Sequence, residues 1–211
     1  MREYEKLLKT RETNIYGVGP WYWIAEDNGA WEGPNTDWAS HLTEYKKFVK
    51  NWGVVVQAGG GQGMYPRLFS DHFERVYTFE PDPLNFICLV NNCQKDNIFK
   101  MQAALGAERG WVRVSRNTPT NTGMNTVRTD QGTCYIPMLT IDSLVLDRCD
   151  LIQLDIEGYE ANAIKGGINT IEQFKPVIAC ERGNDAIFNQ LKPLGYEVAS
   201  RSFADTIYVS A

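Results

Sequence analysis

Several features that would mark a membrane, secreted or metal-binding protein are missing from this sequence. No apolar run approaches the roughly 18 residues that span a bilayer, and the opening Met-Arg-Glu-Tyr-Glu is too polar for a targeting signal. The five cysteines form no C-x-x-C pair and no cluster with histidine, and their odd number does not suit a disulfide framework. We therefore expect reduced thiols, a cytoplasmic protein and no membrane partner.

Excess positive charge is also missing. The formal net charge is −5 and the isoelectric point is near 5.1, so the chain carries no basic footprint for the phosphates of a nucleic acid. With 211 residues, 43% hydrophobic and 22% charged, the chain is long enough for one α/β domain with additions. A domain of this size buries about 70% of the surface of its unfolded chain.

Two common nucleotide-binding motifs are absent. The sequence contains no G-x-x-x-x-G-K-[ST], which excludes a P-loop. A dinucleotide-binding G-x-G-x-x-G also fails, because counting from Gly59 and Gly61 puts Met64 at the third position, and counting from Gly61 and Gly63 puts Pro66 there. An NAD-dependent enzyme is therefore a weak alternative.

A glycine-rich turn follows the apolar run Val54–Val56 and has the pattern G-x-G-x-G at Gly59, Gly61 and Gly63. The run predicts a buried strand, and the glycines allow a tight turn and a close approach of the backbone to a ligand. A second predicted strand ends at Glu80, about twenty residues on, where an α/β nucleotide site places an acid for the ribose hydroxyls. This pattern favours an adenosyl-nucleoside pocket over a merely flexible turn.

Further elements can be predicted in chain order. Pro83 suits the first turn of a helix that runs to about Asn92. Residues 98–105 are predicted to form one strand, with Gln102-Ala103 at its end. An adenosyl site often has an acid-alanine pair at that strand end, so Gln102 is a candidate for the adenine edge. We also expect a helix over 65–71, an extra strand over 111–114, a polar substrate-binding loop over 118–131, a helical turn over 139–144, a helix over 184–191, and a C-terminal antiparallel hairpin of strands 195–198 and 206–209.

Five of the six tryptophans lie in residues 1–53, among glycines and prolines that prevent regular helix until about residue 36. A helix with Leu42, Tyr45 and Phe48 on its apolar face then leads to the first strand. The tryptophan-rich segment is either an apolar arm packed on the sheet or a lid whose aromatic faces form a wall of the substrate pocket. His41 is interpreted as a surface residue of the helix.

Acidic residues follow two later predicted strands. Asp155 comes directly after the apolar run 151–154, and Glu181 follows 176–180. Parallel α/β sheets bind ligands at the carboxyl ends of their strands, so these acids point to a site. Glu157 and Glu160 are expected on one face of the next helix, where they could instead complement the helix N-terminus, and this second role is preferred for Glu160. Two of the acids could hold a divalent ion, but no histidine-rich or clustered carboxylate signature favours one, and no metal is expected.

These residues resemble the FkbM-like S-adenosylmethionine-dependent methyltransferases over 54–209. The resemblance rests on the glycine turn, on Phe79-Glu80-Pro81, and above all on the D-x-E-G-x-E segment 155–160. It implies a class I methyltransferase fold, with a mostly parallel seven-stranded sheet, an antiparallel last strand and helices on both faces. The sequence departs from the family pattern at Gln57 and Gly61, where the family usually has Asp and Asn.

The resemblance implies methyl transfer from S-adenosylmethionine, with O-methylation of a hydroxyl on a sugar, a glycan or a related small molecule as the expected reaction. Because Gln57 replaces an acid, a methyltransferase-like binding module without catalysis is the alternative. We expect a methyltransferase domain over 54–211 preceded by an extension over 1–53. The predicted catalytic residues are Asp155, Glu157 and Glu181, and the predicted cofactor-binding residues are Gln57, Gly59, Gly61, Gly63, Glu80, Pro81, Gln102, Ala103 and Asp155.

Overall fold

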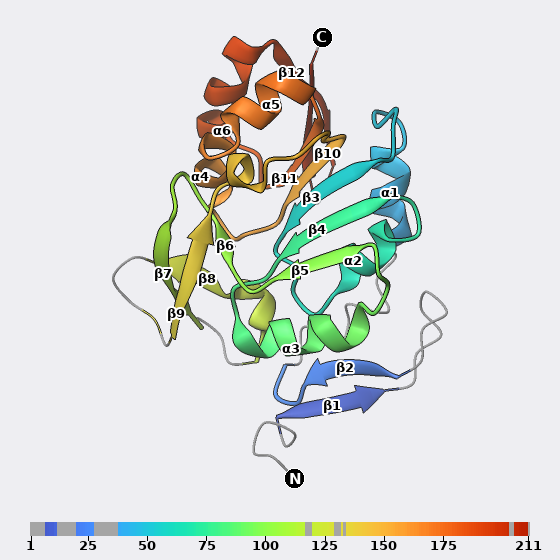
Figure 1. The fold of residues 1–211 in the computed structure, drawn as a ribbon, viewed down its shortest axis with the longest axis vertical. Helices are drawn as coiled ribbons and strands as arrows, with labels where there is room; N and C mark the ends of the chain where they lie inside the picture. Colours follow the sequence, from blue (N-terminus) through green and yellow to red (C-terminus); the bar gives the residue numbers. More distant parts are fainter. Residues whose placement is uncertain are drawn as a thin grey trace.

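A computed structural model describes residues 7–11, 20–27, 38–116, 120–128, 132, 134–202 and 205–210. A seven-stranded sheet runs through the centre of the molecule (Figure 1), in the order β12-β13-β11-β10-β3-β4-β5. β13 is antiparallel to both of its neighbours, and all other neighbouring pairs are parallel, which confirms the expected sheet. The strands are β3 (Val54–Ala58), β4 (Arg75–Phe79), β5 (Ile98–Met101), β10 (Leu151–Leu154), β11 (Val177–Glu181), β12 (Tyr196–Arg201) and β13 (Asp205–Ser210).

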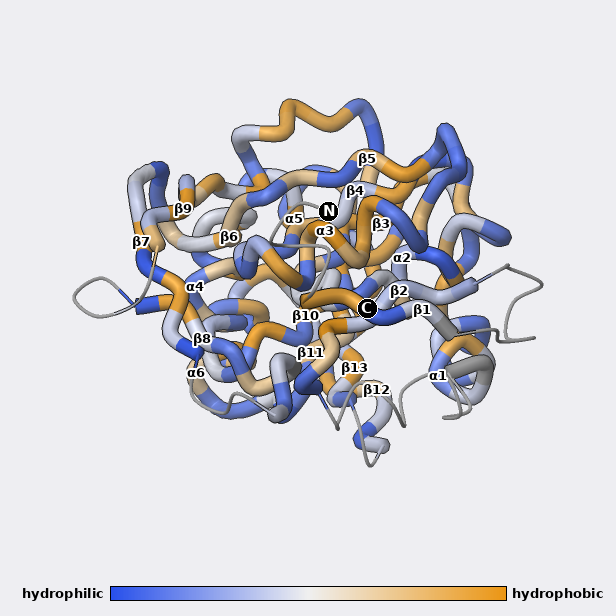
Figure 2. The backbone as a smooth tube through the Cα atoms, turned by 90° about the horizontal axis from the view of Figure 1, so that it is seen from below, coloured by the Kyte–Doolittle hydropathy of each residue, from blue (hydrophilic) through white to orange (hydrophobic). Residues whose placement is uncertain are grey.

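The two central strands are buried along their whole length. Every residue of β3 and of β10 is shielded from solvent, because helices cover both faces of the sheet. Both strands are mainly hydrophobic in Figure 2. Backbone hydrogen bonds continue past the strand ends, since Gly59 and Gly60 donate to the Phe79 carbonyl and Asp155 donates to the Ala58 carbonyl. The carboxyl ends of three neighbouring strands are therefore held in one rigid edge.

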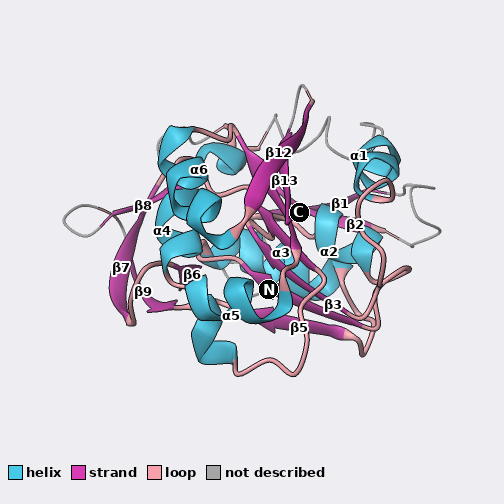
Figure 3. Cartoon of the chain, turned by 90° about the horizontal axis from the view of Figure 1, so that it is seen from above, coloured by secondary structure: helices cyan, strands magenta, loops and turns pink. Residues whose placement is uncertain are grey.

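Helices lie on both sides of the sheet (Figure 3). Residues of α1, α2 and α3 share a core with one face, and residues of α4, α5 and α6 share a core with the other. No helix of the described ranges is long and apolar enough to cross a bilayer. The helices are α1 (Trp38–Tyr45), α2 (Met64–Phe69), α3 (Pro83–Asn92), α4 (Glu160–Lys165), α5 (Ile168–Phe174) and α6 (Asp185–Leu191), and a 3-10 turn, η5 (Ile141–Leu144), stands where a helical turn was expected.

A second sheet lies beside the first and corrects one prediction. Residues 98–105 are not one strand: β5 ends at Met101, and the chain then leaves the central sheet to form β6. The apolar run continues across this break because Ala104 and Leu105 are buried in their new position, so hydrophobicity alone does not mark it. The second sheet has the order β6-β9-β7-β8 and consists of β6 (Ala104–Leu105), β7 (Gly110–Ser115), β8 (Thr126–Arg128) and β9 (Cys134–Leu139).

The segment expected as a polar loop, 118–131, is partly structured. Its residues 120–128 contain the 3-10 turn η4 (Thr122–Met124) and strand β8. β8 pairs with β7 and places Val127 against the small core of the second sheet, which explains why a mostly polar sequence forms a strand. Residues 117–119 and 129–131 lie outside the described part of the chain.

The N-terminal segment forms a hairpin of β1 (Leu8–Arg11) and β2 (Trp21–Ile24). Trp21 and Trp23 are buried, and Asn92 of α3 exchanges two hydrogen bonds with the backbone of Tyr22, at 2.8 and 3.0 Å. Strand β2 is therefore held against the end of α3, with both tryptophans buried. Trp52, just before β3, packs against Phe73, and Trp31 lies outside the described residues.

Candidate functional site

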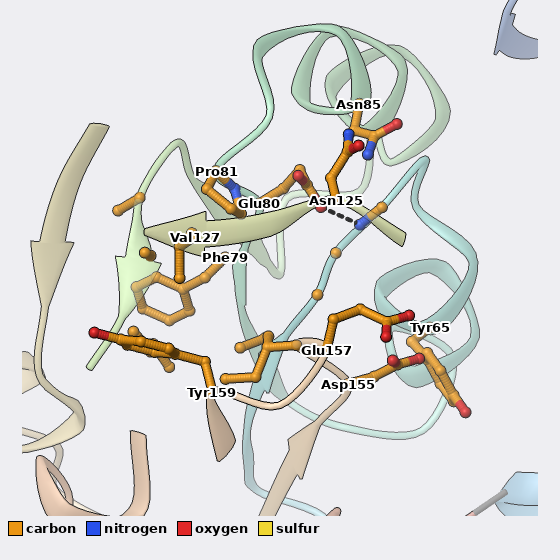
Figure 4. Close-up of a pocket in the computed structure, with 18 of the residues that line it drawn as sticks. Tyr65, Phe79, Glu80, Pro81, Asn85, Asn125, Val127, Asp155, Glu157 and Tyr159 are labelled. Atoms are coloured by element: carbon orange, nitrogen blue, oxygen red, sulfur yellow. Dashed lines mark hydrogen bonds between the residues drawn. The ribbon is translucent and has the colours of Figure 1, made fainter. Parts of the chain in front are cut away.

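A cavity opens at the carboxyl ends of β3, β4 and β10, under η4 and β8 of the second sheet (Figure 4). Its wall contains most of the residues predicted from the sequence, namely Gly59, Gly61, Glu80, Pro81, Ala103, Asp155 and Glu157. Four predicted residues do not line it, and these are Gln57, Gly63, Gln102 and Glu181. The strand, glycine turn, helix and acid that predict a nucleotide site therefore meet at one cavity.

The three glycines of the turn have different structural roles. Gly59 has φ +83°, and a Cβ atom there would lie 1.8 Å from the backbone oxygen of Asp155, so only glycine lets β3 and β10 end side by side. Gly61 has φ +51°, and a Cβ atom there would meet nothing within 4 Å, so its backbone faces open space on the cavity wall. Gly63, at φ +104°, is the residue before α2 and contacts Cys93 away from the cavity.

Gln57 is buried beneath the turn and does not reach the cavity. Its amide nitrogen donates to the Gly59 carbonyl at 2.9 Å, and its amide oxygen accepts from the Thr78 hydroxyl at 2.5 Å. Both ends of the side chain are therefore occupied in holding the turn against β4. Gln57 was predicted to contact the cofactor, but its side chain is directed into the protein and does not line the cavity.

Glu80 stands at the end of β4 with its carboxylate on the cavity wall. It accepts from the backbone N–H of Gly61 at 2.7 Å and of Asp82 at 2.7 Å. Burial raises the pKa of Glu80 to about 8, although these two hydrogen bonds favour the charged form. Burial and these hydrogen bonds therefore act on the Glu80 carboxyl group in opposite directions, and the effect of burial is the larger.

The adenine candidate of the sequence, Gln102, is exposed, whereas the next residue, Ala103, is buried and lines the cavity. The break after β5 explains this, because the chain turns from one sheet to the other at these two residues and directs Gln102 to solvent. The small Ala103 and the rigid Pro81 leave an apolar wall between them, together with Phe79 and Val127.

Three amide oxygens on the cavity wall are buried and have no hydrogen-bond partner within the described part of the chain. They belong to Gln62, Asn85 and Asn125. Their amide nitrogens are already used: Gln62 donates to Asp27 at 3.1 Å, Asn85 to the Thr122 carbonyl at 3.4 Å, and Asn125 to Asp82 at 3.2 Å. The three oxygens are thus fixed as acceptors, and they fit a ligand with several O–H or N–H donors, such as a ribose or an ammonium group.

Two buried acids hold the η4 segment over this cavity. Asp82 begins α3 by accepting from Leu84 and Asn85 backbone N–H groups, and it also binds the Arg116 guanidinium at 2.7 and 3.2 Å. Asp27, from the segment after β2, accepts from the hydroxyl and the backbone N–H of Thr122. The N-terminal segment therefore contributes to the site through Asp27, although its described tryptophans do not line it.

At the end of the cavity opposite the asparagines, Asp155 and Glu157 lie on the wall and Glu181 adjoins them. Asp155, Glu157 and Glu181 each place an oxygen within 4.8 Å of the others. Burial raises the pKa of Asp155 well above its usual range, and the neighbouring Glu181 carboxyl raises it further. Burial and the charge of Glu181 also raise the pKa of Glu157. The Asp155 and Glu157 carboxyl groups are therefore harder to ionise than isolated ones.

The three acids are close enough to share a divalent ion, but protein groups already offset part of their charge. The Arg182 guanidinium lies 3.6 Å from Glu157 and 3.5 Å from Glu181. The geometry supplies a compact acidic end to the cavity, suited to a cation or to a hydroxyl group that must lose its proton.

The expected helical face of Glu157 and Glu160 is wrong. Glu157 has φ +51° and Gly158 has φ +93°, so the chain turns before α4 begins at Glu160. The buried Glu160 accepts from the backbone N–H groups of Ile156 and Gly158, at 3.1 and 3.2 Å. It therefore holds the turn that presents Glu157, in keeping with its preferred structural role.

His41 is not a surface residue with a free side chain. Its Nδ1 lies 2.8 Å from the Tyr65 hydroxyl and 3.7 Å from Asp205, and 18% of its side chain is exposed. Tyr65 lines the cavity beside Asp155, as Figure 4 shows. No local sequence pattern predicts this contact, because His41, Tyr65 and Asp205 lie on α1, α2 and β13.

Other residues of the site also escaped the sequence analysis. Gln62 lies inside the glycine turn, and Asn125 and Thr122 lie in the segment identified as a substrate-binding loop, so their positions could have been listed as candidates. Tyr159 lies inside the D-x-E-G-x-E segment, whose acids alone were singled out, and Asn85 could equally have been part of the surface of the helix that begins at Pro83.

The sequence and the fold are similar to those of known proteins. A family model described as the methyltransferase FkbM domain matches residues 65–205. No curated protein sequence matches the chain.

Two solved structures share its fold. A methyltransferase FkbM from Methylobacillus flagellatus KT is 22% identical, with a TM-score of 0.56 over 75% of this chain and 44% of that one. Trm5b from Pyrococcus abyssi is 13% identical, with a TM-score of 0.52 over 96% of this chain and 55% of that one. The chain thus spans about half the length of each of these proteins.

Proposed function

The chain belongs to the FkbM methyltransferase family, and on that premise we propose that it transfers a methyl group to a hydroxyl of a sugar, a glycan or a related small molecule. The observation that carries the proposal is the meeting of a nucleoside-like cavity with three carboxyl groups at one end. S-adenosylmethionine is the methyl donor of such enzymes, and it supplies a methyl group activated by a positively charged sulfur.

The cavity wall fits this donor. Gly61 leaves room for close backbone approach, and Glu80 offers a carboxylate for the ribose hydroxyls. The unpaired amide oxygens of Asn85, Asn125 and Gln62 offer acceptors for hydroxyl or ammonium donors. Pro81 and Ala103 leave an apolar wall of the kind that suits an adenine ring. A bound ribose would also replace part of the solvation that Glu80 has lost on burial.

The acidic end suits the reacting groups. A sulfonium charge near Asp155 would offset the repulsion from Glu181 and favour the ionised form of Asp155. An acceptor hydroxyl placed there would meet the Asp155 and Glu157 carboxyl groups, and Glu181 would act on it from beside them. Alignment of two reactants contributes about 7–11 kcal/mol to such a reaction, and a general base about 10²–10⁴-fold, so positioning dominates.

The acidic surroundings and the free thiols support the remaining proposals. Clustered carboxyl groups repel the phosphates of a nucleic acid, which supports a small-molecule or glycan acceptor. All five cysteines are unpaired, and this supports a reducing, cytoplasmic compartment.

The position of Gln57 supports an enzyme over a non-catalytic binding module. Gln57 hydrogen-bonds to Gly59 and Thr78 under the turn, so its replacement of an acid removes no side chain from the cavity wall described above. The carboxyl groups expected to act on the acceptor are all present.

Calorimetry and a transfer assay test the proposal together. S-adenosylhomocysteine should bind the protein, and labelled methyl groups from S-adenosylmethionine should appear in a pool of glycans or hydroxylated small molecules. Lack of binding would contradict the whole proposal, whereas binding without transfer to any hydroxylated pool would favour the binding module.

A further inference from the structure

The outward face of the second sheet carries exposed aromatic and arginine side chains. Burial alternates along β7 and β9, because one face of these strands packs in the core and the other is directed away from it. Trp111 is 67% exposed and Tyr135 is 61% exposed, although tryptophan side chains are highly buried on average. The strands lie at the edge of the molecule (Figure 3). We call this surface the aromatic–arginine face, and it consists of Trp111, Arg113, Arg128, Tyr135 and Pro137.

The pairing of the strands brings these five residues together. Trp111 lies opposite Pro137, and Arg113 lies opposite Tyr135, in the register of β7 with β9. Arg113 also lies opposite Arg128, in the register of β7 with β8. Opposite residues of an antiparallel pair point to the same face, and diagonal neighbours such as Trp111 and Tyr135 are typically about 7–8 Å apart. Two aromatic rings and two guanidinium groups therefore share one continuous surface.

The two arginines of this face stand opposite each other, and like charges in such positions are destabilising. No ion pair within the described ranges includes Arg113 or Arg128. The Arg113 guanidinium lies 4.2 Å from the centre of the Tyr135 ring and donates to the Tyr135 hydroxyl at 2.6 Å. These contacts hold the guanidinium in place but supply no carboxylate to offset its charge. The face therefore fits a ligand with negative charge.

We propose that the aromatic–arginine face binds an acidic glycan, at sugar units remote from the hydroxyl that is methylated in the cavity, an inference that rests on the proposed function. Exposed Trp and Tyr rings offer flat apolar surfaces, on which the C–H faces of sugar rings can stack. Guanidinium groups bind carboxylates and sulfates through several parallel hydrogen bonds, which suits sugar acids and sulfated sugars. The ligand is thus an oligosaccharide that carries such groups.

Strand β8 connects this face with the cavity. Asn125 and Val127 line the cavity, whereas Arg128, the next residue along β8, is exposed on the aromatic–arginine face. β8 is also the last strand in the order β6-β9-β7-β8, so no other strand of the described residues pairs with its outer edge. A glycan of several sugar units can therefore pass around β8, with one unit in the cavity and others on the outward face.

Charge disfavours two other occupants of this face. A nucleic acid carries a phosphate on every nucleotide and needs a long basic surface, whereas the net charge of this chain is −5 and the face has two arginines. A second copy of the chain, packed face to face about a two-fold axis, would bring the arginines of both copies together. An acidic glycan fits better, because its charges are fewer and are separated by sugar rings.

The binding step can be measured without turnover. We would saturate the protein with S-adenosylhomocysteine and titrate it by calorimetry with hexamers of galacturonate, mannuronate and sulfated chondroitin, and with neutral maltohexaose. The test variants are Trp111→Ala and Arg128→Gln. The matched controls are Phe99→Ala, which removes a 43% exposed ring from β5, and Arg201→Gln, which removes an exposed guanidinium from β12.

At least one acidic hexamer should bind the wild type, and added salt should weaken this binding because it screens exposed charges. Trp111→Ala and Arg128→Gln should each weaken it at least about tenfold, as the truncation of aromatic and arginine anchors does in other interfaces. Maltohexaose should bind at least about tenfold more weakly than the acidic hexamer. Both controls should bind as the wild type does, and every variant should keep its affinity for S-adenosylhomocysteine within about twofold.

A transfer assay with the bound hexamer tests the connection to the cavity. Trp111→Ala should raise the Michaelis constant for this acceptor at least about fivefold, with little change in the rate at saturation, because the ring binds a remote part of the substrate. An equal effect of Trp111→Ala on a monosaccharide acceptor would overturn that connection.

Several outcomes would overturn the glycan face and leave O-methylation intact. They are failure of every acidic hexamer to bind, equal binding by Trp111→Ala and the wild type, tighter binding of a single-stranded RNA hexamer than of any glycan, and a dimer that Trp111→Ala dissociates. If an acidic hexamer binds this face but no hydroxylated compound is methylated, the face stands as a binding surface and the proposed function fails.

Discussion

Gly59 and Gly61 are two residues apart, yet the structure predicts different consequences for replacing each by alanine: mainly a loss of stability at Gly59 and mainly a loss of ligand binding at Gly61. At Gly59, with φ +83°, the new Cβ would lie 1.8 Å from the Asp155 carbonyl oxygen and 2.8 Å from its carbon. Neither backbone can move freely, because Gly59 donates to Phe79 and Asp155 donates to Ala58. A left-handed alanine costs about 1–2 kcal/mol and overpacking about 1–3 kcal/mol, so we expect a loss of about 2–5 kcal/mol.

Gly61→Ala keeps only the conformational part of this cost. At φ +51° its Cβ would have no neighbour within 4 Å, so we expect a loss of about 1–2 kcal/mol. For a chain of this size each kcal/mol lowers Tm by about 2–4 °C, which predicts about 4–20 °C for Gly59→Ala and about 2–8 °C for Gly61→Ala. The Gly61 variant should nevertheless bind S-adenosylhomocysteine at least tenfold more weakly, because its methyl group enters the cavity.

Thermal unfolding and calorimetry on both variants separate the two roles. If Gly61→Ala binds S-adenosylhomocysteine as the wild type does, the turn does not approach the donor and the assignment of the cavity is wrong. A Gly59→Ala protein as stable as the wild type would contradict the packing of β3 against β10.

Four further predictions concern the acids of the site. Glu80→Ala should weaken S-adenosylhomocysteine binding by about 1.5–3 kcal/mol for each hydrogen bond lost to a charged acceptor, measured by calorimetry. Folding raises the pKa of Glu80 from near 4.5 to about 8, so the folded protein binds this proton more tightly than the unfolded chain does. The Tm of the wild type should therefore fall as pH rises from about 5 to 8, and Glu80→Gln should reduce that fall. An equal fall in the wild type and in Glu80→Gln would disprove this. Asp155→Asn should slow single-turnover transfer at least tenfold with little loss of Tm, and normal transfer would remove Asp155 from the site. Glu157→Gln should raise the Michaelis constant for the acceptor, and a change in Tm alone would assign Glu157 a structural role.

The central sheet could be predicted because its signals are local. The run Val54–Val56 is long, apolar and β-branched, and glycines follow it at once, so strand and turn were both identified. Pro83 marked the first turn of α3, and the structure adds only the carboxylate of Asp82 that caps it. At such positions a few neighbouring residues determine the local conformation.

The parts that were missed depend on contacts between distant segments. The break after Met101 cannot be recognised from the hydrophobicity of the sequence, because Ala104 and Leu105 are apolar and are buried in the second sheet. His41 meets Asp205 across more than 160 residues, and no spacing rule connects them. Glu157 was placed on a helix because its spacing to Glu160 suits one, but the positive φ of two residues, the first of them not glycine, is a tertiary effect. The cavity wall was therefore predictable where it follows the strand ends, and not where the second sheet and α1 reach it.

The central claim, methyl transfer to an acceptor hydroxyl, can be tested most directly with S-adenosylmethionine labelled by carbon-13 in its methyl group. The protein would be incubated with this donor and a pool of glycans and hydroxylated small molecules, with Asp155→Asn as the control, and the products examined by carbon NMR. The account predicts a new labelled methoxyl resonance that depends on the protein and is at least tenfold weaker with the Asp155 variant. A label that appears only as N-methyl or S-methyl, or that stays entirely on the donor, would contradict it.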